Sequence, residues 1–358
     1  RMMNIKEVRN ELLNEKYYDI DHPSGLKILV MPKENYSSTY AIFATKYGSI
    51  DTMIQMSDGS FKEIPEGTAH FLEHKLFESE DLDAFAKTGA SANAYTSFER
   101  TGYLFSCSAN FKKNLEILLD FVQNPYFTQA TVEKEQGIIG QEIDMYKDAP
   151  DWEVMFNCLR TMYHNLPVRI DIAGTQESIA QITAKTLYGC YDNFYNLHNM
   201  VLAVAGNADV DEIVEVADKV LKPVEGKMAQ RKVIDEPEEV IDSYIEEKLS
   251  VATPQFMFGF KESWDTPERT TKEEISMEIL LDMISGQSSE LYKRLFDGKL
   301  INNSFGFEYF TGFGYSCVLF AGESNDPKKV AEEIVGEIGR FRETGFDETA
   351  FERTKKKL

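Results

Sequence analysis

Two histidines and a glutamate within five residues are the strongest sign of chemistry in the chain. Residues 70–74 read HFLEH, so His70 and His74 are four positions apart and Glu73 lies beside them. On a helix, side chains at this spacing share one face. Two such imidazoles can ligate a tetrahedral zinc ion, which lowers the pKa of its water to about 7, and the carboxylate can take that water's proton as it attacks a carbonyl. The motif predicts zinc-dependent hydrolysis, and the alternative is an exposed polar helix face.

A zinc site of this kind needs a third protein ligand, and a second helix offers two candidates. Residues 131–146 show helical spacing of apolar residues, with Thr131 as the predicted N-cap. Glu135 and Glu142 are seven residues apart in this segment and therefore lie on one face. One of them could ligate the metal while the other holds a ligand histidine in place. The residues alone leave the choice open, and also the alternative of a charged surface helix.

The elements that must position these residues mix strands and helices without strict alternation. This pattern favours an α+β fold over a doubly wound sheet. Strands are predicted at residues 25–32, 39–44, 91–108 (one or two strands) and 201–205, and helices at 68–77, 111–122, 131–146, 178–194 and 210–221.

The chain then passes through a segment with the character of a linker. Residues 226–245 are rich in Glu, Lys, Asp and Pro and have no apolar period. Beyond them the pattern restarts, and it resembles the first half closely enough to indicate an internal repeat. Strands are predicted at 255–260 and around 303–320, and helices at 272–285 and 327–342. We therefore expect a zinc-binding catalytic domain at residues 1–225 and a second homologous domain at 246–358, incomplete at its end and free of metal.

Composition excludes several classes of partner. With 60 acidic against 38 basic residues the formal net charge is −22, which repels phosphate backbones and anionic membranes. We expect neither nucleic acid nor a membrane as a partner, and no apolar run reaches the roughly 18 residues of a transmembrane helix. Residues 1–10 lack the apolar core of a signal peptide, so a cytoplasmic location is expected. The four cysteines are scattered without a Cys-x-x-Cys pair, which argues against a sulfur-ligated zinc site.

Three segments, in this order, resemble the signatures of the pitrilysin/insulysin family of metallopeptidases, the insulinase-like family with an inverted zinc motif. They are residues 70–74, residues 91–97 (SANAYTS) and residues 133–143 (EKEQGIIGQEI). Residues 195–207 (YNLHNMVLAVAGN) resemble the family's next landmark. The likeness extends over about residues 20–350, dense in the first half and faint in the second. Within the family it looks most like small bacterial YmfH-type subunits and mitochondrial-processing-peptidase-like proteins.

The resemblance implies two homologous domains, each with an antiparallel-rich sheet and helices on one side. It further implies a zinc endopeptidase that hydrolyses peptides or unfolded segments, bound as an added β-strand inside a clamshell chamber. Its site residues would be the zinc ligands His70, His74 and Glu142, the general base Glu73, the supporting carboxylate Glu135, and the substrate-binding residues Asn93 and Ala94. From the residues alone, Asn93 could equally be a turn residue.

The second half departs from the pattern of the family's catalytic members. They carry an Arg and a Tyr that support the transition state, and neither stands at the expected place in residues 294–304 (RLFDGKLINNS), although Arg294 could serve if displaced. We therefore expect a homodimer, or a heterodimer with a homologous subunit that supplies these donors. Two other functions remain open: a non-catalytic assembly or binding subunit of a heterodimeric peptidase-like complex, and a zinc hydrolase of non-peptide amides.

Overall fold

The computed structural model describes residues 4–10 and 15–357, which form two compact units. The first unit consists of the chain up to Ile143 together with Ile170–Lys232, and the second of Asp144–Arg169 together with the chain from Val233 onward. The expectation drawn from residues 1–10 rests partly on residues 1–3, which lie outside the described residues.

The compact units are not contiguous in sequence, unlike the predicted domains 1–225 and 246–358. The segment Asp144–Arg169 belongs to the second unit because its helix α5 (Pro150–Met162) packs against strand β10 (Gln255–Lys261). The two units show which residues pack together, not which segments are homologous. The boundaries of the two homologous domains, 1–225 and 246–358, therefore stay a prediction.

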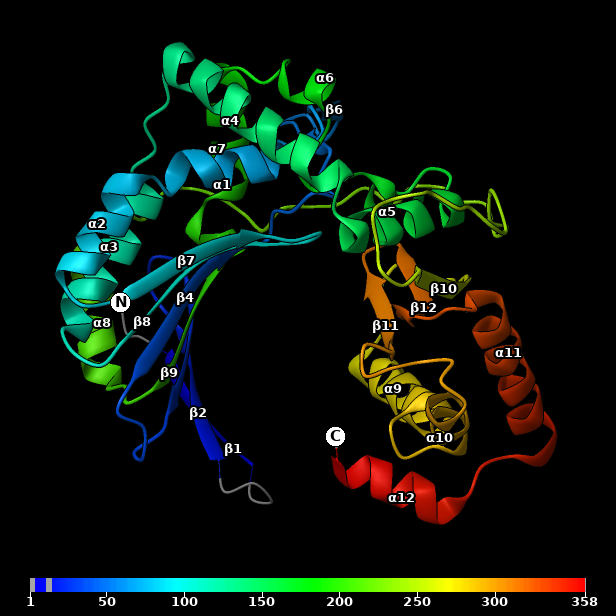
Figure 1. Ribbon diagram of the computed structural model, residues 1–358. Coiled ribbons are helices and arrows are strands. Elements are labelled where there is room, and N and C mark those ends of the chain that lie inside the picture. The colour runs from blue at the N-terminus through cyan, green and yellow to red at the C-terminus, as the bar shows by residue number, and fades with distance from the viewer. Residues whose placement is uncertain (1–3, 11–14, 358) are drawn as a thin grey trace. The chain divides into compact units, whose positions relative to one another are not determined.

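A mixed sheet with helices on one face forms the first unit (Figure 1). Within the described residues it has seven strands in the order β1-β2-β3-β9-β4-β8-β7, all antiparallel to their neighbours except the parallel pair β3–β9. The strands are β1 Asn4–Asn10, β2 Glu15–Asp21, β3 Lys27–Pro32, β4 Thr39–Thr45, β7 Ser91–Thr96, β8 Thr101–Cys107 and β9 Met200–Gly206. The predicted α+β class is confirmed.

The core of this unit lies between the sheet and helices α2 (Ser79–Lys87), α3 (Phe111–Gln123) and α8 (Val210–Val220). Phe43 of β4 and Phe105 of β8 are fully buried. Helix α3 packs against β4 and β8. Its buried leucines, Leu115, Leu118 and Leu119, lie three or four residues apart and form one apolar stripe. A short hairpin of β5 (Met53–Gln55) and β6 (Phe61–Glu63) completes the strands of the described part of this unit.

Two predicted helices differ from those observed. Helix α4 (Gln129–Lys147) begins before Thr131, and the N–H of Thr131 is donated to Oγ1 of Thr128 at 3.2 Å. Thr131 is therefore not the N-cap, and that prediction was wrong. The helix predicted over 178–194 is two, α6 (Gln176–Ile179) and α7 (Ala184–Phe194), because the side chain of Thr183 caps α7.

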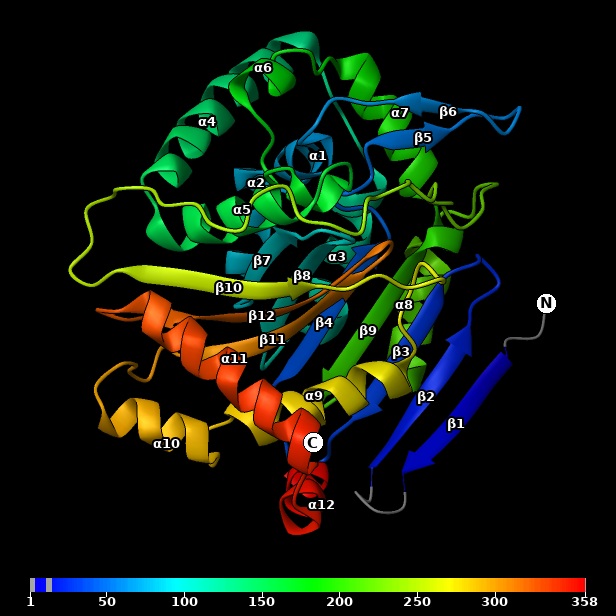
Figure 2. The same cartoon turned by 90° about the vertical axis from the view of Figure 1, so that its right-hand side faces the viewer.

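A smaller antiparallel sheet organises the second unit, in the order β10-β12-β11. Helix α9 packs against β11 and α11 against β10 (Figure 2). The same order occurs in the first sheet as β4-β8-β7, which supports the predicted repeat. The remaining elements are α9 Thr271–Ser285, α10 Glu290–Asp297, β11 Gly306–Gly312, β12 Tyr315–Glu323, α11 Pro327–Thr344 and α12 Glu348–Lys357.

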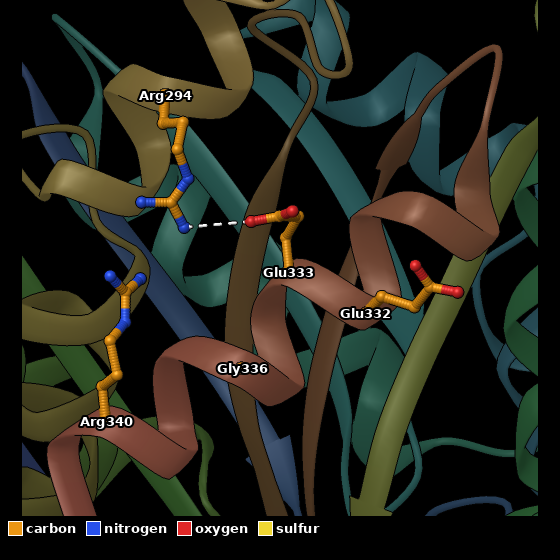
Figure 3. A pocket seen from close by; sticks show the side chains of 5 residues that line it. All are labelled: Arg294, Glu332, Glu333, Gly336 and Arg340. Atoms are coloured by element: carbon orange, nitrogen blue, oxygen red, sulfur yellow. Dashed lines mark hydrogen bonds and ion pairs between the residues drawn. The ribbon is translucent and has the colours of Figure 1, made fainter.

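Arg294, the arginine of residues 294–304, is engaged in ion pairs within the second unit. From α10 its Nη2 contacts Glu333 at 3.1 Å and Glu337 at 3.4 Å, both on α11. Arg340 also pairs with Glu337. Figure 3 shows Arg294 directed toward Glu333 in a pocket that Arg340 also lines. This arrangement gives Arg294 a role in joining two helices.

No helix in the described ranges is both long and apolar enough to cross a membrane.

Candidate metal centre

The histidine motif lies on helix α1 (Thr68–Leu76), which is held by its apolar face. Phe71 and Leu72 are fully buried, so the helix is fixed against the body of the first unit. His70 is nearly buried, with 9% of its side chain exposed, whereas Glu73 and His74 retain 13% and 24%. The helix thus presents two imidazoles and a carboxylate at a partly shielded surface.

The start of α1 fits against the loop that precedes α6. Gly67 has φ +86°, and a Cβ there would lie 2.5 Å from the carbonyl oxygen of Ala173. Gly174 has φ +79°, and a Cβ there would lie 2.6 Å from the carbonyl oxygen of Glu66. The Ser178 hydroxyl also donates to the Glu66 carbonyl at 2.8 Å. Only glycine suits both positions, since both the left-handed backbone and the close approach exclude a side chain.

Helix α4 is tied to the segment that begins with this loop. Gln136 Nε2 donates to the carbonyl oxygens of Ile179 and Ile182 at 3.1 and 3.0 Å. Gln176 Nε2 donates to the carbonyl oxygen of Gly140 at 2.7 Å, and a Cβ on Gly140 would lie 2.8 Å from Gln176 Oε1. One segment therefore holds both α1 and α4, which fixes the carboxylates of α4 relative to the histidines.

Three side chains from these two helices converge on one point. Glu142 Oε1 lies 3.5 Å from His70 Nε2, and Glu142 Oε2 lies 3.4 Å from His74 Nε2. The potential ligand atoms of the three residues all lie within 4.8 Å of one another. Ligands bound to tetrahedral zinc at about 2.0–2.1 Å are about 3.3–3.4 Å apart, so the spacing suits such an ion.

The surroundings of His70 give an independent test of this fit. Its Nδ1 is buried and has no hydrogen-bond partner among the described residues. The 3.5 Å from its Nε2 to Glu142 is longer than a normal hydrogen bond. A buried polar atom without a partner costs about 1–3 kcal/mol, and the binding free energy of a metal at Nε2 would offset that cost. Two imidazoles and one carboxylate are also a donor set that zinc accepts, so the residues present fit the ion.

Glu135 lies on the other side of His74. Its Oε1 is 2.9 Å from His74 Nδ1. When Nδ1 donates its hydrogen to this carboxylate, Nε2 is left with a lone pair directed away from Glu135 and available to a metal. Burial lowers the pKa of His74, but the bond to Glu135 and the neighbouring carboxylates together raise it above its ordinary value. The field that attracts a proton to this site also attracts a cation.

The carboxylate of Glu73 lies beside the converging ligand atoms without joining them. Its Oε2 is 4.0 Å from His74 Nε2, and its Oε1 accepts a hydrogen bond from Thr96 Oγ1 at 3.4 Å. Burial raises the pKa of Glu73, and the two histidines partly oppose that effect. A carboxylate with a raised pKa is a better proton acceptor near neutral pH.

Asn93 and Ala94 lie within the edge strand β7, which pairs with β8 alone among the described strands. The alternative of a turn at Asn93 is therefore wrong. The N–H of Ala94 is donated to the Asn93 side-chain oxygen at 2.8 Å and not to β8. This N–H belongs to the unpaired edge of the sheet, where an extended peptide can add as a further strand.

Thr96, Gln136 and Gln176 position the site and were missed in the sequence. Thr96 lies within the SANAYTS segment, whose resemblance drew attention only to Asn93 and Ala94. The two glutamines carry no signal in the sequence, because their partners are backbone carbonyls distant along the chain.

Comparison with known proteins assigns this arrangement to a family. Residues 49–176 match the model described as Insulinase (Peptidase family M16), and residues 181–358 match the one described as Peptidase M16 inactive domain. The chain is 42% identical to the uncharacterized zinc protease YmfH of Bacillus subtilis, an alignment that covers 99% of this chain and 85% of that protein. The chain belongs to peptidase family M16. The predicted resemblance is confirmed.

Solved structures of M16 proteins agree in fold. A putative M16-like peptidase from Alicyclobacillus acidocaldarius superposes with a TM-score of 0.89 at 38% identity, over 100% of this chain and 83% of that one. Pitrilysin gives a TM-score of 0.76 at 16% identity, over 97% of this chain and 39% of that one, and shows the fold alone. The mitochondrial-processing peptidase subunit beta of Bos taurus is 36% identical over 42% of this chain and 32% of its own length.

Proposed function

We propose that this M16 chain is a zinc-dependent endopeptidase that hydrolyses peptides or unfolded segments. The observation that carries the proposal is the convergence of His70, His74 and Glu142 beside the carboxylate of Glu73, which does not join them. Three protein ligands with a free acid–base group nearby are typical of catalytic zinc sites. Relatives named as zinc proteases agree with this assignment.

Each residue then has a distinct role. His70, His74 and Glu142 would hold the zinc, which when bound would polarise the scissile carbonyl and lower the pKa of the attacking water. Glu73 takes the proton of that water at its Oε2 and returns it to the leaving amine. Glu135 keeps the His74 ring oriented with Nε2 toward the metal.

The peptide would lie extended along strand β7. The outward N–H of Ala94 is donated to the Asn93 side chain in the free chain and would pass to a substrate carbonyl, which would release the exposed Asn93 amide for further polar contacts. Such binding depends mainly on the substrate's backbone, so many sequences would be accepted. A clamshell chamber closed by a homologous subunit would then select substrates by size.

A non-catalytic assembly subunit is the second candidate. Relatives named as subunits of the mitochondrial-processing peptidase support assembly with another chain, and the match of residues 181–358 to a model described as an inactive domain agrees with a non-catalytic role. Assembly alone has no physical need for a carboxylate beside two histidines and a third ligand, so we place it second. Family membership favours peptide bonds over other amides as the substrate.

The test compares wild type with Glu73→Gln on a mixed peptide library, with zinc measured in both proteins. We expect the variant to retain zinc and to lose about 10²- to 10⁴-fold in turnover, because an amide keeps the shape but accepts no proton. Glu80→Gln, at an exposed glutamate of α2, is the matched control and should behave as wild type. Near-normal turnover in zinc-loaded Glu73→Gln would show that another group is the base. Zinc-loaded wild type that cleaves no peptide, even after a homologous subunit is added, would favour the assembly role.

A further inference from the structure

The two oxygens of the Glu73 carboxylate have different neighbours. Oε2 lies 4.0 Å from His74 Nε2, on the side of the candidate metal ligands. Oε1 accepts a hydrogen bond from the hydroxyl of Thr96 at 3.4 Å. The carboxylate is therefore held by one oxygen while the other faces the reaction site. Catalytic hydrogen bonds are often this long before substrate binds and shorten in the complex.

Thr96 reaches Glu73 from the strand that would receive the substrate. It is the last residue of β7 and pairs with Thr101 of β8. Alternate residues of a strand share a face, so Thr96 and Ala94 are on the same side of the sheet, and both are partly buried, whereas Asn93 is exposed. Helix α1 packs against β7, which brings Glu73 within reach of this side.

We propose that Thr96 is a positioning residue that holds the Glu73 carboxylate by Oε1 and leaves Oε2 to act on the attacking water. The inference rests on the proposed function and deepens it. A glutamate side chain has three rotatable bonds, and an anion so close to a bound cation is drawn toward it. The hydrogen bond from Thr96 opposes that rotation, so Glu73 remains a base and does not become a ligand. Because Thr96 and Ala94 belong to one strand, this hydrogen bond also fixes the distance between the Glu73 carboxylate and a substrate backbone bound at Ala94.

Three variants separate this role from general packing. Thr96→Val removes the hydroxyl and keeps both the volume and the β-branched shape. Thr96→Ser keeps the hydroxyl and loses only a methyl group. Ser91→Ala removes a hydroxyl from the exposed first residue of the same strand and is the matched control.

In zinc-loaded protein we expect Thr96→Val to lower kcat by about 10- to 100-fold with KM and zinc content unchanged. Thr96→Ser should recover most of the rate, and Ser91→Ala should equal wild type. In the Glu73→Gln background, Thr96→Val should cause no further loss, since the carboxylate that it positions is gone. A kcat for Thr96→Val equal to that of Ser91→Ala, or a loss accompanied by loss of zinc or a raised KM, would overturn the proposal.

Crystal structures of the zinc-loaded Thr96→Val and Thr96→Ser proteins give a readout that needs no activity. The Glu73 carboxylate should rotate in the valine variant and keep its wild-type position in the serine variant. An unmoved carboxylate in Thr96→Val would overturn the proposal even in an active enzyme. If wild type hydrolyses no peptide, the proposed function fails, while the two structures still decide whether Thr96 holds Glu73.

Discussion

His74 is contacted on both of its ring nitrogens by carboxylates of one helix. Glu135 lies 2.9 Å from Nδ1, and Glu142 lies 3.4 Å from Nε2. These contacts are chemically different, because a bond at Nδ1 orients the ring and fixes its tautomer, whereas Nε2 is left for the metal. His70 has no corresponding partner at Nδ1 among the described residues. The orientation of the pair therefore depends on His74 and its carboxylate.

Removal of Glu135 should weaken zinc binding without abolishing it. We expect Glu135→Ala to lower zinc affinity by about 10- to 100-fold, since the His74 ring loses its orientation, and Glu135→Gln to lose less because an acceptor oxygen remains. Competition with a chromogenic chelator measures the affinity. Glu133→Ala, at an exposed glutamate on the same helix, removes the same charge. An equal loss of zinc affinity in Glu133→Ala would show that the effect comes from the removed charge and not from the contact with His74.

At this scale the sequence predicted the chemistry but could not assign the two glutamates. The spacing of His70, Glu73 and His74 is local and survives folding, because one helix determines it. Glu135 and Glu142 share a face of α4, so spacing alone treats them as equivalent. Which one meets the Nε2 atoms depends on how far α4 is shifted along α1. Tertiary hydrogen bonds set that shift, and the family resemblance supplied the assignment that the residues did not.

Among the elements, edge strand β7 has the clearest consequence for substrate. The N–H of Ala94 is donated to its neighbouring side chain and not to β8, so proline there leaves the sheet's own pairing intact. A substrate strand added to β7, in contrast, would lose the N–H of residue 94 as a hydrogen-bond donor.

We expect Ala94→Pro to raise KM for many unrelated peptides alike. The loss of one backbone hydrogen bond is worth about 0.5–1.5 kcal/mol, or about 2- to 13-fold. Steady-state kinetics on several peptides measure it, and an unchanged melting temperature shows that the fold is retained. Ala94→Ser alters the side chain and keeps the N–H, so it should behave as wild type. If folded Ala94→Pro bound all peptides as wild type does, substrate would not add to this edge.

Elements that were missed in the sequence share a weak local signal. Most of β1 and the first half of β2 are exposed, and charged residues interrupt the apolar ones in both strands, so the apolar alternation by which a strand is recognised is weak. The break between α6 and α7 was missed for the opposite reason, since apolar residues continue at helical spacing across the capping residue Thr183. Elements with a continuous buried stripe, such as α3, were predicted within a residue.

At the scale of the whole molecule, the second unit offers no free Arg294 or Tyr309 side chain as a transition-state donor. Arg294 is held by Glu333 and Glu337, and the hydroxyl of Tyr309 accepts a hydrogen bond from Ser316 at 3.0 Å. Burial also raises the pKa of Tyr309 to about 12. One missing donor to the oxyanion costs about 2.7–4 kcal/mol. We propose that a homologous subunit supplies these donors.

The chain on its own should then bind zinc but hydrolyse peptides slowly. The loss of one donor predicts a turnover about 10²- to 10³-fold below that of the assembled enzyme. The measurement is the turnover number of the purified chain, shown by light scattering to be free of any partner, before and after addition of a homologous subunit. An undiminished rate in the isolated chain would contradict a divided site.

The central claim is that His70, His74 and Glu142 bind one zinc ion. Anomalous diffraction at the zinc edge, from crystals of the zinc-loaded protein, tests it most directly. We expect a single peak about 2.0–2.1 Å from Nε2 of both histidines and about 2.0–2.2 Å from a Glu142 oxygen, absent in His70→Ala and Glu142→Ala. A zinc ion held by other residues, or no peak at these three side chains, would contradict it.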